Sequence, residues 1–182
     1  PQLRLCMEPL EVIDHPAGFF QLPFGVGDRV FHPAHGAGIV IAIERPALHE
    51  DFNRYYAIQL VAPPMRVLVP VRTASTIGLR AVAIPKAATS ALEALQSAAD
   101  ALPDDFKTRQ AAIADRLRTG NLDVLAMLVR DLAARGRDRV FSPTEARLFE
   151  QARVMLCGEL SLALDAAVDV VGRMIDEHLQ GG

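Results

Sequence analysis

Residues 24–40, FGVGDRVFHPAHGAGIV, decide how the first half of the chain folds. Pro33 fixes a bend between His32 and His35, and the surrounding glycines allow backbone angles that other residues rarely adopt. These glycines are Gly25, Gly27, Gly36 and Gly38. A phosphate-binding loop would lead from such glycines into a helix, but β-branched residues follow here. The stretch is therefore predicted to be a strand and a turn.

The two histidines of this stretch are predicted to be turn residues. His32 and His35 are three positions apart, which is a ligand spacing on a helix but not in a strand and turn. The sequence offers no third ligand at a suitable spacing nearby. We therefore expect no metal site, and we expect no other cofactor.

Short segments of β-forming sequence follow. They read DRVFH, AGIVIAIE, FNRYYAIQLV and MRVLVPV, and Gly, Pro, Asn or charged residues bound each of them. Pro70 cannot donate a ladder hydrogen bond, so it belongs at a sheet edge or a strand end. Tyr55 and Tyr56 alternate across one strand, so one of them should face the core. Such a run of short antiparallel strands predicts a small curled sheet or barrel.

The second half of the sequence is typical of helices. Asp104 or Asp105 is a candidate cap for one helix, which Gly120 should end. Asn121 should cap the next helix, and Gly136 should punctuate it. The long helix after that opens with Ser-Pro-Thr-Glu, which combines a cap, a proline at the first helical position and a glutamate at the third.

These patterns predict a two-domain α+β chain. An arm over residues 1–23 precedes a small antiparallel β module over 24–84, and a compact all-α domain fills 85–182. The arrangement of residues 165–182 stays open, because they could extend the last helix or fold back as a separate one.

Composition narrows the class of protein. Hydrophobic residues make up 51% of the chain, which excludes disorder as a whole, and no run reaches the roughly 18 apolar residues of a membrane span. Cys6 and Cys157 are too few for a disulfide framework or a zinc site, so a reducing compartment is expected. We therefore expect a soluble, cytoplasmic and bacterial protein.

Charge is polarised along the chain, although the net charge is only −3. Residues 107–153 carry ten basic and six acidic side chains, whereas residues 154–182 carry one arginine and five acidic residues. Runs of charge are usually solvated surface. Charge alone therefore leaves nucleic-acid binding open.

Two parts of the sequence resemble the CarD/CdnL family of bacterial transcription regulators. FGVGDRVFHPAHGAGIVIAIE, YYAIQL, VLVPV and IGLR resemble its N-terminal module, which is similar to the polymerase-interacting domain of transcription-repair coupling factor. GNLDVLAMLVRDLAARGRDRVFSPTEARLFEQARVMLCGEL resembles its C-terminal helical domain. The resemblance, over residues 24–164, implies a Tudor-like β-barrel that docks on the β subunit of RNA polymerase. It also implies a helical domain that contacts promoter DNA and favours the open complex.

The resemblance indicates where polymerase would dock. Two arginines that are important for docking in the family fall on Pro46 and Leu68, while Arg45 and Arg66 lie one and two positions away. A shift of one residue turns a strand side chain to the other face. The four residues are candidate polymerase contacts, and for the two arginines a role as solvated edge charges stays equally open.

The resemblance also indicates an apolar DNA wedge. Family members carry a tryptophan at the start of a helix, and Phe106 occupies the matching position here. Phenylalanine can insert between base steps with a smaller stacking area. Phe106 also shares a helical stripe with Ile113 and Leu117, so burial in the core stays open. The acidic residues before it would repel phosphates unless they cap the helix.

A cationic face would accompany this wedge. The DNA-binding candidates are Phe106, Lys107, Arg109, Arg130, Arg135, Arg137, Arg139 and Arg147. No side-chain set for base-edge readout can be recognised. Contacts are therefore expected to the DNA backbone and the minor groove, with a steep dependence on salt.

Catalysis is not expected. Cys157 lies in VMLCGEL among apolar residues, where cysteine behaves as a small buried hydrophobe, and Asp176 and Glu177 point in different directions on a helix. We expect no catalytic residue, no small-molecule substrate and no membrane partner. The stronger alternative is a protein-only adaptor that binds polymerase or another partner without touching DNA. A buried Phe106 with scattered arginines would favour that alternative.

Overall fold

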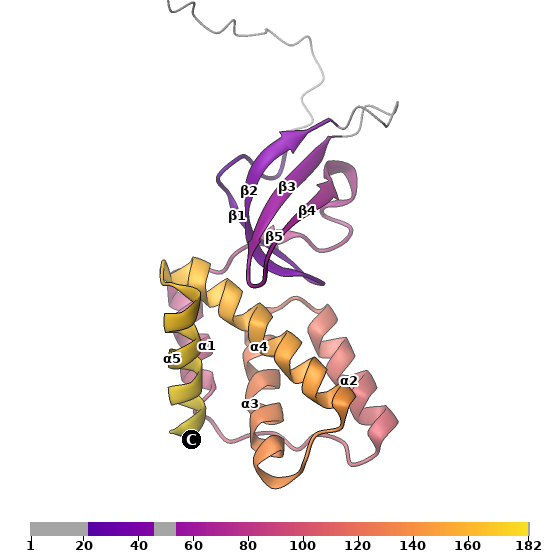
Figure 1. The fold of residues 1–182 in the computed structure, drawn as a ribbon, viewed down its shortest axis with the longest axis vertical. Helices are drawn as coiled ribbons and strands as arrows, with labels where there is room; N and C mark the ends of the chain where they lie inside the picture. The colour runs from indigo at the N-terminus through magenta and orange to yellow at the C-terminus, as the bar shows by residue number, and fades with distance from the viewer. Residues whose placement is uncertain (1–21, 46–53, 182) are drawn as a thin grey trace, which may run out of the picture.

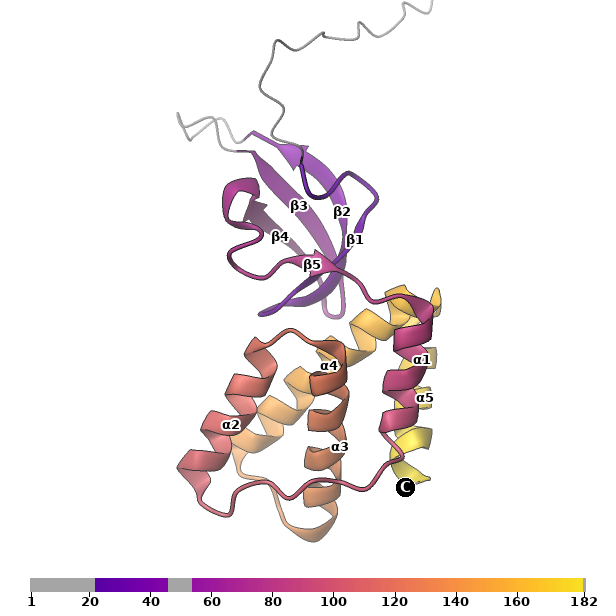
Figure 2. The same ribbon diagram turned by 180° about the vertical axis from the view of Figure 1, so that it is seen from behind.

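Residues 22–45 and 54–181, which the structure describes, form a five-stranded antiparallel sheet followed by five α-helices in this computed structural model (Figures 1 and 2). The strands are β1 (Arg29–His32), β2 (Gly36–Glu44), β3 (Tyr55–Val61), β4 (Pro64–Pro70) and β5 (Arg80–Ala81). The helices are α1 (Pro85–Ala94), α2 (Phe106–Arg118), α3 (Leu122–Asp138), α4 (Pro143–Leu164) and α5 (Val168–Gln180).

The sheet is open and curled. Its strand order is β4-β3-β2-β1-β5, so β4 and β5 are its edges, and they do not pair with each other to close a barrel in the described residues. Pro70 ends the edge strand β4, as its missing N–H predicts. The sheet curls around a small core of its own, in which Tyr56 is fully buried. Tyr56 is therefore the tyrosine of the 55–56 pair that faces the core.

The turn between β1 and β2 is built as the sequence predicts. The N–H of His35 donates to the carbonyl oxygen of His32 at 3.1 Å, and the N–H of Ala34 donates to His32 Nδ1, also at 3.1 Å. The two imidazole rings lie 4.5 Å apart. Burial, and then the neighbouring His35, lower the pKa of His32. The turn is therefore held by its own backbone and by a neutral imidazole.

Two glycines of the quoted stretch are required for different reasons. Gly36 has φ of +90°, which a side chain rarely tolerates. Gly38 has ordinary angles, but a Cβ there would lie 2.6 Å from the carbonyl oxygen of Gln59 on β3. Only glycine lets β2 approach β3 this closely.

The helix caps follow the predictions closely. Asp105 caps α2 by accepting from the N–H of Thr108 at 2.8 Å, and Asn121 caps α3. Ser142 and Glu145 form a reciprocal capping box at the start of α4.

Gly136 does not interrupt α3, and the prediction that it would is wrong. The helix continues to Asp138. The Phe141 ring lies 2.9 Å from where a Cβ of Gly136 would be, so the glycine makes room for that ring. A packing requirement, and not a backbone angle, therefore explains this residue.

The C-terminal segment is a separate helix. Asp165 ends α4 with φ of +56°, and α5 then packs back against α4. Arg153 on α4 donates to both carboxylate oxygens of Asp176 on α5, at 2.8 and 2.7 Å. The open question about residues 165–182 is thereby answered for the described residues, in favour of a helix that folds back.

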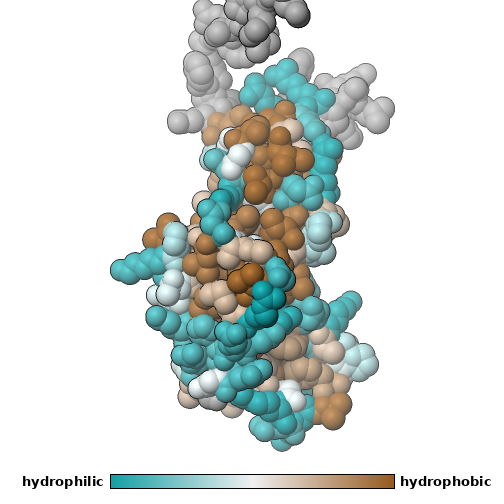
Figure 3. All heavy atoms as spheres, turned by 60° about the vertical axis from the view of Figure 1, so that its left-hand side comes forward, coloured by the Kyte–Doolittle hydropathy of each residue, from teal (hydrophilic) through white to brown (hydrophobic). Residues whose placement is uncertain are grey.

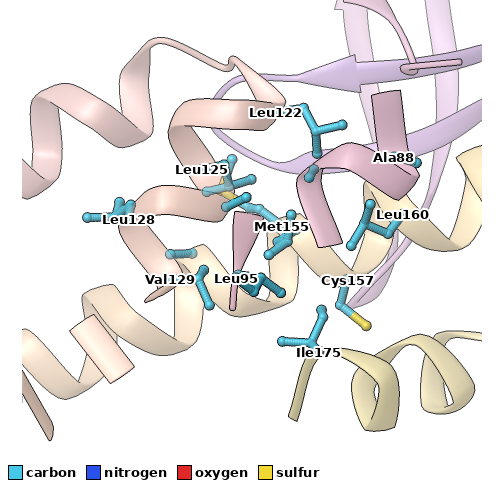
Figure 4. Close-up of a cluster of buried hydrophobic side chains, with 14 of the residues drawn as sticks. Ala88, Leu95, Leu122, Leu125, Leu128, Val129, Met155, Cys157, Leu160 and Ile175 are labelled. Atoms are coloured by element: carbon cyan, nitrogen blue, oxygen red, sulfur yellow. The ribbon is translucent and has the colours of Figure 1, made fainter. Parts of the chain in front are cut away.

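The helices share one hydrophobic core, to which the sheet contributes. Side chains from the α1 segment, α3, α4 and α5 converge in Figure 4, which includes Leu128, Met155 and Ile175. Phe31 and Ala37 of the sheet belong to the same buried cluster. The sheet therefore packs directly on the helices.

A buried carboxylate holds the sheet to α4. Glu159 is fully buried and accepts two hydrogen bonds from Arg80 of β5, at 2.6 and 2.8 Å, and one from the N–H of Ala83. Arg80 also donates to the carbonyl oxygen of Gly120, at 2.7 Å, and its guanidinium lies 4.3 Å from the Phe31 ring centroid. One arginine thus joins β5, the α2–α3 turn and α4.

This bridge gives a stability prediction. Arg80→Met leaves Glu159 as a buried charge with one remaining N–H donor, so we expect it to lower the free energy of unfolding by about 3 kcal/mol. Urea unfolding measures this change. The control is Arg66→Met, which removes an exposed ion pair with Glu44 and should cost less than about 1 kcal/mol. Equal losses for the two variants would contradict the role given to the bridge.

Candidate functional site

Most DNA-binding candidates gather at the end of the helical part that points away from the sheet. The start of α2, the end of α3 and the start of α4 all lie there (Figures 1 and 2). We call this end the helical tip and define it by its exposed basic and apolar side chains. They are Phe106, Lys107, Arg137, Arg139, Val140 and Arg147. Asp104, Asp105 and Asp138 are also exposed at this end.

Phe106 lies on the surface of the helical tip. It is the first residue of α2, and 45% of it is exposed, whereas Ile113 and Leu117 on the same helix are buried. The core interpretation of Phe106 is therefore wrong. Asp105 is occupied as the helix cap, and the N–H and hydroxyl groups of Thr108 lower its pKa. The carboxylate of Asp105, next to Phe106, therefore serves as a helix cap.

Arg109 does not belong to the cationic surface, contrary to our expectation. Only 5% of its side chain is exposed, and its Nε donates to Glu145 Oε1 at 2.6 Å. Its Nη1 donates to the carbonyl oxygens of Pro103 and Asp104, at 2.7 Å each. Arg109 is the fourth residue of α2, and it lies in the first helical turn on the side that meets Glu145 of α4.

Arg130 is buried as well, and its expected place on a cationic face is also corrected. Its guanidinium donates to Asp131, to Asp100 and to the hydroxyl of Ser97. Arg116 donates to the second carboxylate oxygen of Asp131, which is itself buried. The arginine serves to join α3 to the segment after α1.

The remaining basic candidates are closer to the solvent. Arg135 is mostly buried, with 16% of its side chain exposed and its Nε 3.2 Å from Glu145 Oε1. Arg137 is exposed and donates to the carbonyl oxygen of Leu179 at 3.0 Å. Lys107, Arg139 and Arg147 are exposed. The cationic surface is therefore smaller than the sequence indicates. Lys107 directly follows Phe106 in the chain, whereas Arg139 follows the end of α3 and Arg147 lies in the first part of α4.

The sequence did not indicate a role in this site for two residues at this end of the molecule, the exposed Val140 and the buried Glu145. Val140 is 96% exposed between α3 and α4. The neighbouring sequence does not distinguish an exposed valine at this position from one that packs against the core. Glu145 was recognised only as part of a capping box, although it also binds Arg109 and Arg135. Arg109 lies 36 positions from Glu145, and sequence spacing gives no signal for such a pair.

The polymerase-binding candidates lie on the opposite end of the molecule, on the sheet. Figure 3 brings forward the β1 side of the sheet, and apolar surface gathers over the sheet part there; the candidates lie on and beside other strands. Arg66 and Leu68 are two positions apart on β4, so they share one face of this edge strand. Leu68 is 48% exposed, and Arg66 forms an ion pair with Glu44 on β2. Arg66 lies two residues from Leu68, the position where an arginine was expected for docking. It is therefore displaced along the strand but stays on the same face.

The other two polymerase-binding candidates lie at the end of β2. Arg45 is exposed and directly follows the last strand residue, Glu44. Pro46 lies outside the described residues. Side chains alternate between the two faces of a sheet only within a strand, and Arg45 lies beyond the end of β2. The change of face expected from its one-residue shift therefore does not apply to Arg45.

Cys157, a candidate nucleophile in the sequence, is buried in α4. Burial raises the pKa of the Cys157 thiol, which donates to the carbonyl oxygen of Val168 at 3.1 Å. Within residues 22–45 and 54–181, no group of three metal-ligating side chains lies together. No helix in this part of the chain is long and apolar enough to cross a membrane.

Comparison with known proteins gives the family. Residues 24–83 match the family model of the CarD-like/TRCF RID domain, and residues 90–176 match that of the CarD C-terminal domain. The chain belongs to the CarD/CdnL family. The protein named "Putative transcription factor YdeB" of Bacillus subtilis (strain 168) is 27% identical over 139 residues, which are 76% of this chain and 91% of that protein.

Family membership confirms the resemblance in both halves and in the same order. This CarD/CdnL chain is a transcription regulator of the type that interacts with RNA polymerase. Contact with DNA and the identity of the polymerase subunit are taken up as proposals below.

The buried Glu145 predicts a dependence of stability on pH. Burial raises its pKa, but hydrogen bonds from Ser142 and Arg109 outweigh burial and hold the pKa at about 2, below the usual 4.5. A carboxyl that is more acidic in the folded state stabilises the fold above its unfolded pKa. This contribution, of order 3 kcal/mol at neutral pH, is lost as the pH falls from about 4.5 to about 2.

The measurement is urea unfolding of the wild type and Glu145→Gln between pH 7 and pH 2. Other carboxyls titrate in both proteins, so the informative quantity is the difference in unfolding free energy. We expect the wild type to be the more stable protein at pH 7 and the difference to shrink below about pH 4.5. A difference that does not change with pH would contradict the role of the ionised carboxylate.

Proposed function

We propose that this CarD/CdnL chain docks on the β subunit of RNA polymerase through its Tudor-like sheet and contacts promoter DNA through its helical tip. The two contacts together favour the open promoter complex. The protein acts by binding, and its DNA contacts are to the backbone and the minor groove.

One observation carries the DNA contact: a large apolar side chain and several basic side chains are exposed at the same end of the helical part. Phe106 begins α2 with 45% of its surface exposed, and Lys107, Arg139 and Arg147 are exposed at the same end. Basic side chains neutralise phosphates, and an apolar side chain can wedge between base steps in the minor groove. This combination suits the edge of a melted DNA bubble, where a base step is already unstacked.

The docking contact is supported by the free edge of the sheet. Among the strands of the described residues, β4 pairs only with β3, so its other side can add to a strand of a partner. Leu68 and Arg66 on the same face supply an exposed apolar side chain and a cation. Main-chain pairing would give affinity, and these side chains would give specificity.

A protein-only adaptor is the second candidate, and a specific observation favours it. Arg109 and Arg130 are buried in ion pairs, so the cationic surface lacks two of its expected members. Asp104 is exposed beside Phe106, and the net charge of the chain is −3. Such a chain would bind polymerase and leave the DNA untouched.

The lifetime of the open complex separates the two candidates. We expect the wild type to lengthen this lifetime on a promoter with the cognate polymerase. Phe106→Ala should remove most of the effect, because the apolar side chain that would occupy the unstacked step is gone. The readout is the decay of competitor-resistant complexes, with and without the protein.

The control is Val170→Ala on α5, which also shortens an exposed apolar side chain but lies outside the helical tip. It should behave as the wild type does. If the wild type binds polymerase and leaves the lifetime unchanged, the DNA contact is refuted and the adaptor is the better account.

Docking through β4 has its own test. Leu68→Glu places a charge in the proposed interface and should weaken binding to polymerase roughly tenfold or more, because a desolvated apolar contact is lost. Titration of labelled protein with core polymerase measures the dissociation constant. Val170→Glu is the matched control, and an equal weakening by both variants would refute docking at this edge.

A further inference from the structure

The position of Phe106 is set by a buried arginine. Because almost half of Phe106 is exposed, core packing does not fix its ring. The Arg109 guanidinium carbon lies 5.9 Å from the ring centroid, within reach of a cation–π contact. The same guanidinium donates to the carbonyl oxygens of Pro103 and Asp104, which precede the α2 cap. Arg109 therefore contacts the ring and also fixes the chain that leads into it.

A single carboxylate in turn fixes Arg109. Glu145 Oε1 accepts from Arg109 at 2.6 Å and from Arg135 at 3.2 Å, while Oε2 accepts from the N–H of Ser142 at 3.0 Å. Only 3% of the Glu145 side chain is exposed. The carboxylate thus ties together the start of α2, the end of α3 and the start of α4.

Stability alone is a weak explanation for this pair. Two charged groups lose their hydration when they are buried. Replacing such a pair with apolar residues of similar volume often leaves the stability of the fold unchanged or raises it. An arginine fork, however, makes several directed hydrogen bonds at once, which neither an apolar side chain nor lysine can do. Directed bonds to the residues around Phe106 indicate that the pair determines geometry.

We propose that Arg109 and Glu145 are positioning residues that hold Phe106 in a fixed orientation for its contact with DNA. This inference rests on the proposed function, because a fixed orientation of the Phe106 ring has a role only if the ring contacts DNA. A side chain that is already ordered loses less conformational entropy on binding, so preorganisation strengthens the contact.

The local order of position 106 can be measured directly. The chain contains two tyrosines but no tryptophan, so Phe106→Trp introduces a single indole at the helical tip, which can be excited at wavelengths where tyrosine does not absorb. Fluorescence anisotropy decay should show a restrained indole in this background. Adding Arg109→Lys or Glu145→Gln should introduce a fast, large-amplitude motion. Glu145→Gln keeps the shape of the side chain, and circular dichroism and urea unfolding report whether each variant is folded.

Open-complex lifetime then links this order to function. With Phe106 in place, Arg109→Lys and Glu145→Gln should each shorten the lifetime roughly three- to tenfold while the affinity for polymerase stays unchanged. The matched control is Arg153→Lys, which perturbs the Arg153–Asp176 ion pair between α4 and α5, away from the tip. It should change neither the lifetime nor the motion at position 106.

The outcomes separate this inference from the proposed function. If Phe106→Ala shortens the lifetime but Arg109→Lys and Glu145→Gln do not, or if the indole stays restrained in both variants, the positioning role is overturned and the DNA contact stands. If Phe106→Ala itself leaves the lifetime unchanged, the DNA contact fails and the positioning role falls with it, whatever the fluorescence reports.

Discussion

Glu159 has no access to water, and the arrangement of the whole molecule follows from that constraint. A buried carboxylate is tolerated only with fixed donors, and here they are the guanidinium of Arg80 and the N–H of Ala83. Arg80 must therefore lie where β5 meets α4, and its hydrogen bond to Gly120 brings the α2–α3 turn to the same place. Next to Glu159, the helix runs close to the sheet, since a Cβ added at Gly158 would lie 3.4 Å from the Cβ of Ala62. The sheet and the helices consequently share one orientation.

A fixed orientation gives the two candidate surfaces a fixed separation. The edge strand β4 lies on the sheet at one end, and the helical tip lies at the other (Figures 1 and 2). A protein that binds polymerase with one end can thereby deliver the other to a defined place on the DNA. The two buried glutamates divide this task, since Glu159 sets the position of the helices and Glu145 sets the local geometry around Phe106. Both act through an arginine fork that holds several acceptors at once.

Sequence patterns predicted what local chemistry determines. The alternation in β3, the cap residues Asp105 and Asn121, and the capping box of α4 all depend on near neighbours, and all were found. Burial of Arg109 and Arg130 could not be predicted, because their carboxylate partners and carbonyl acceptors are brought together only by the packing of helices. For the same reason, the contact between Gly136 and the Phe141 ring could not be predicted. Charge counted along a chain therefore overestimates the charge on its surface.

If the buried bridge fixes the helices on the sheet, both parts tumble as one body, and backbone ¹⁵N relaxation of the wild-type protein tests this most directly. One rotational correlation time should fit the amides of β1–β4 and those of α2–α4. Two distinct correlation times, with the helices tumbling independently of the sheet, would contradict the account. The buried bridge would then not determine where the helical tip lies.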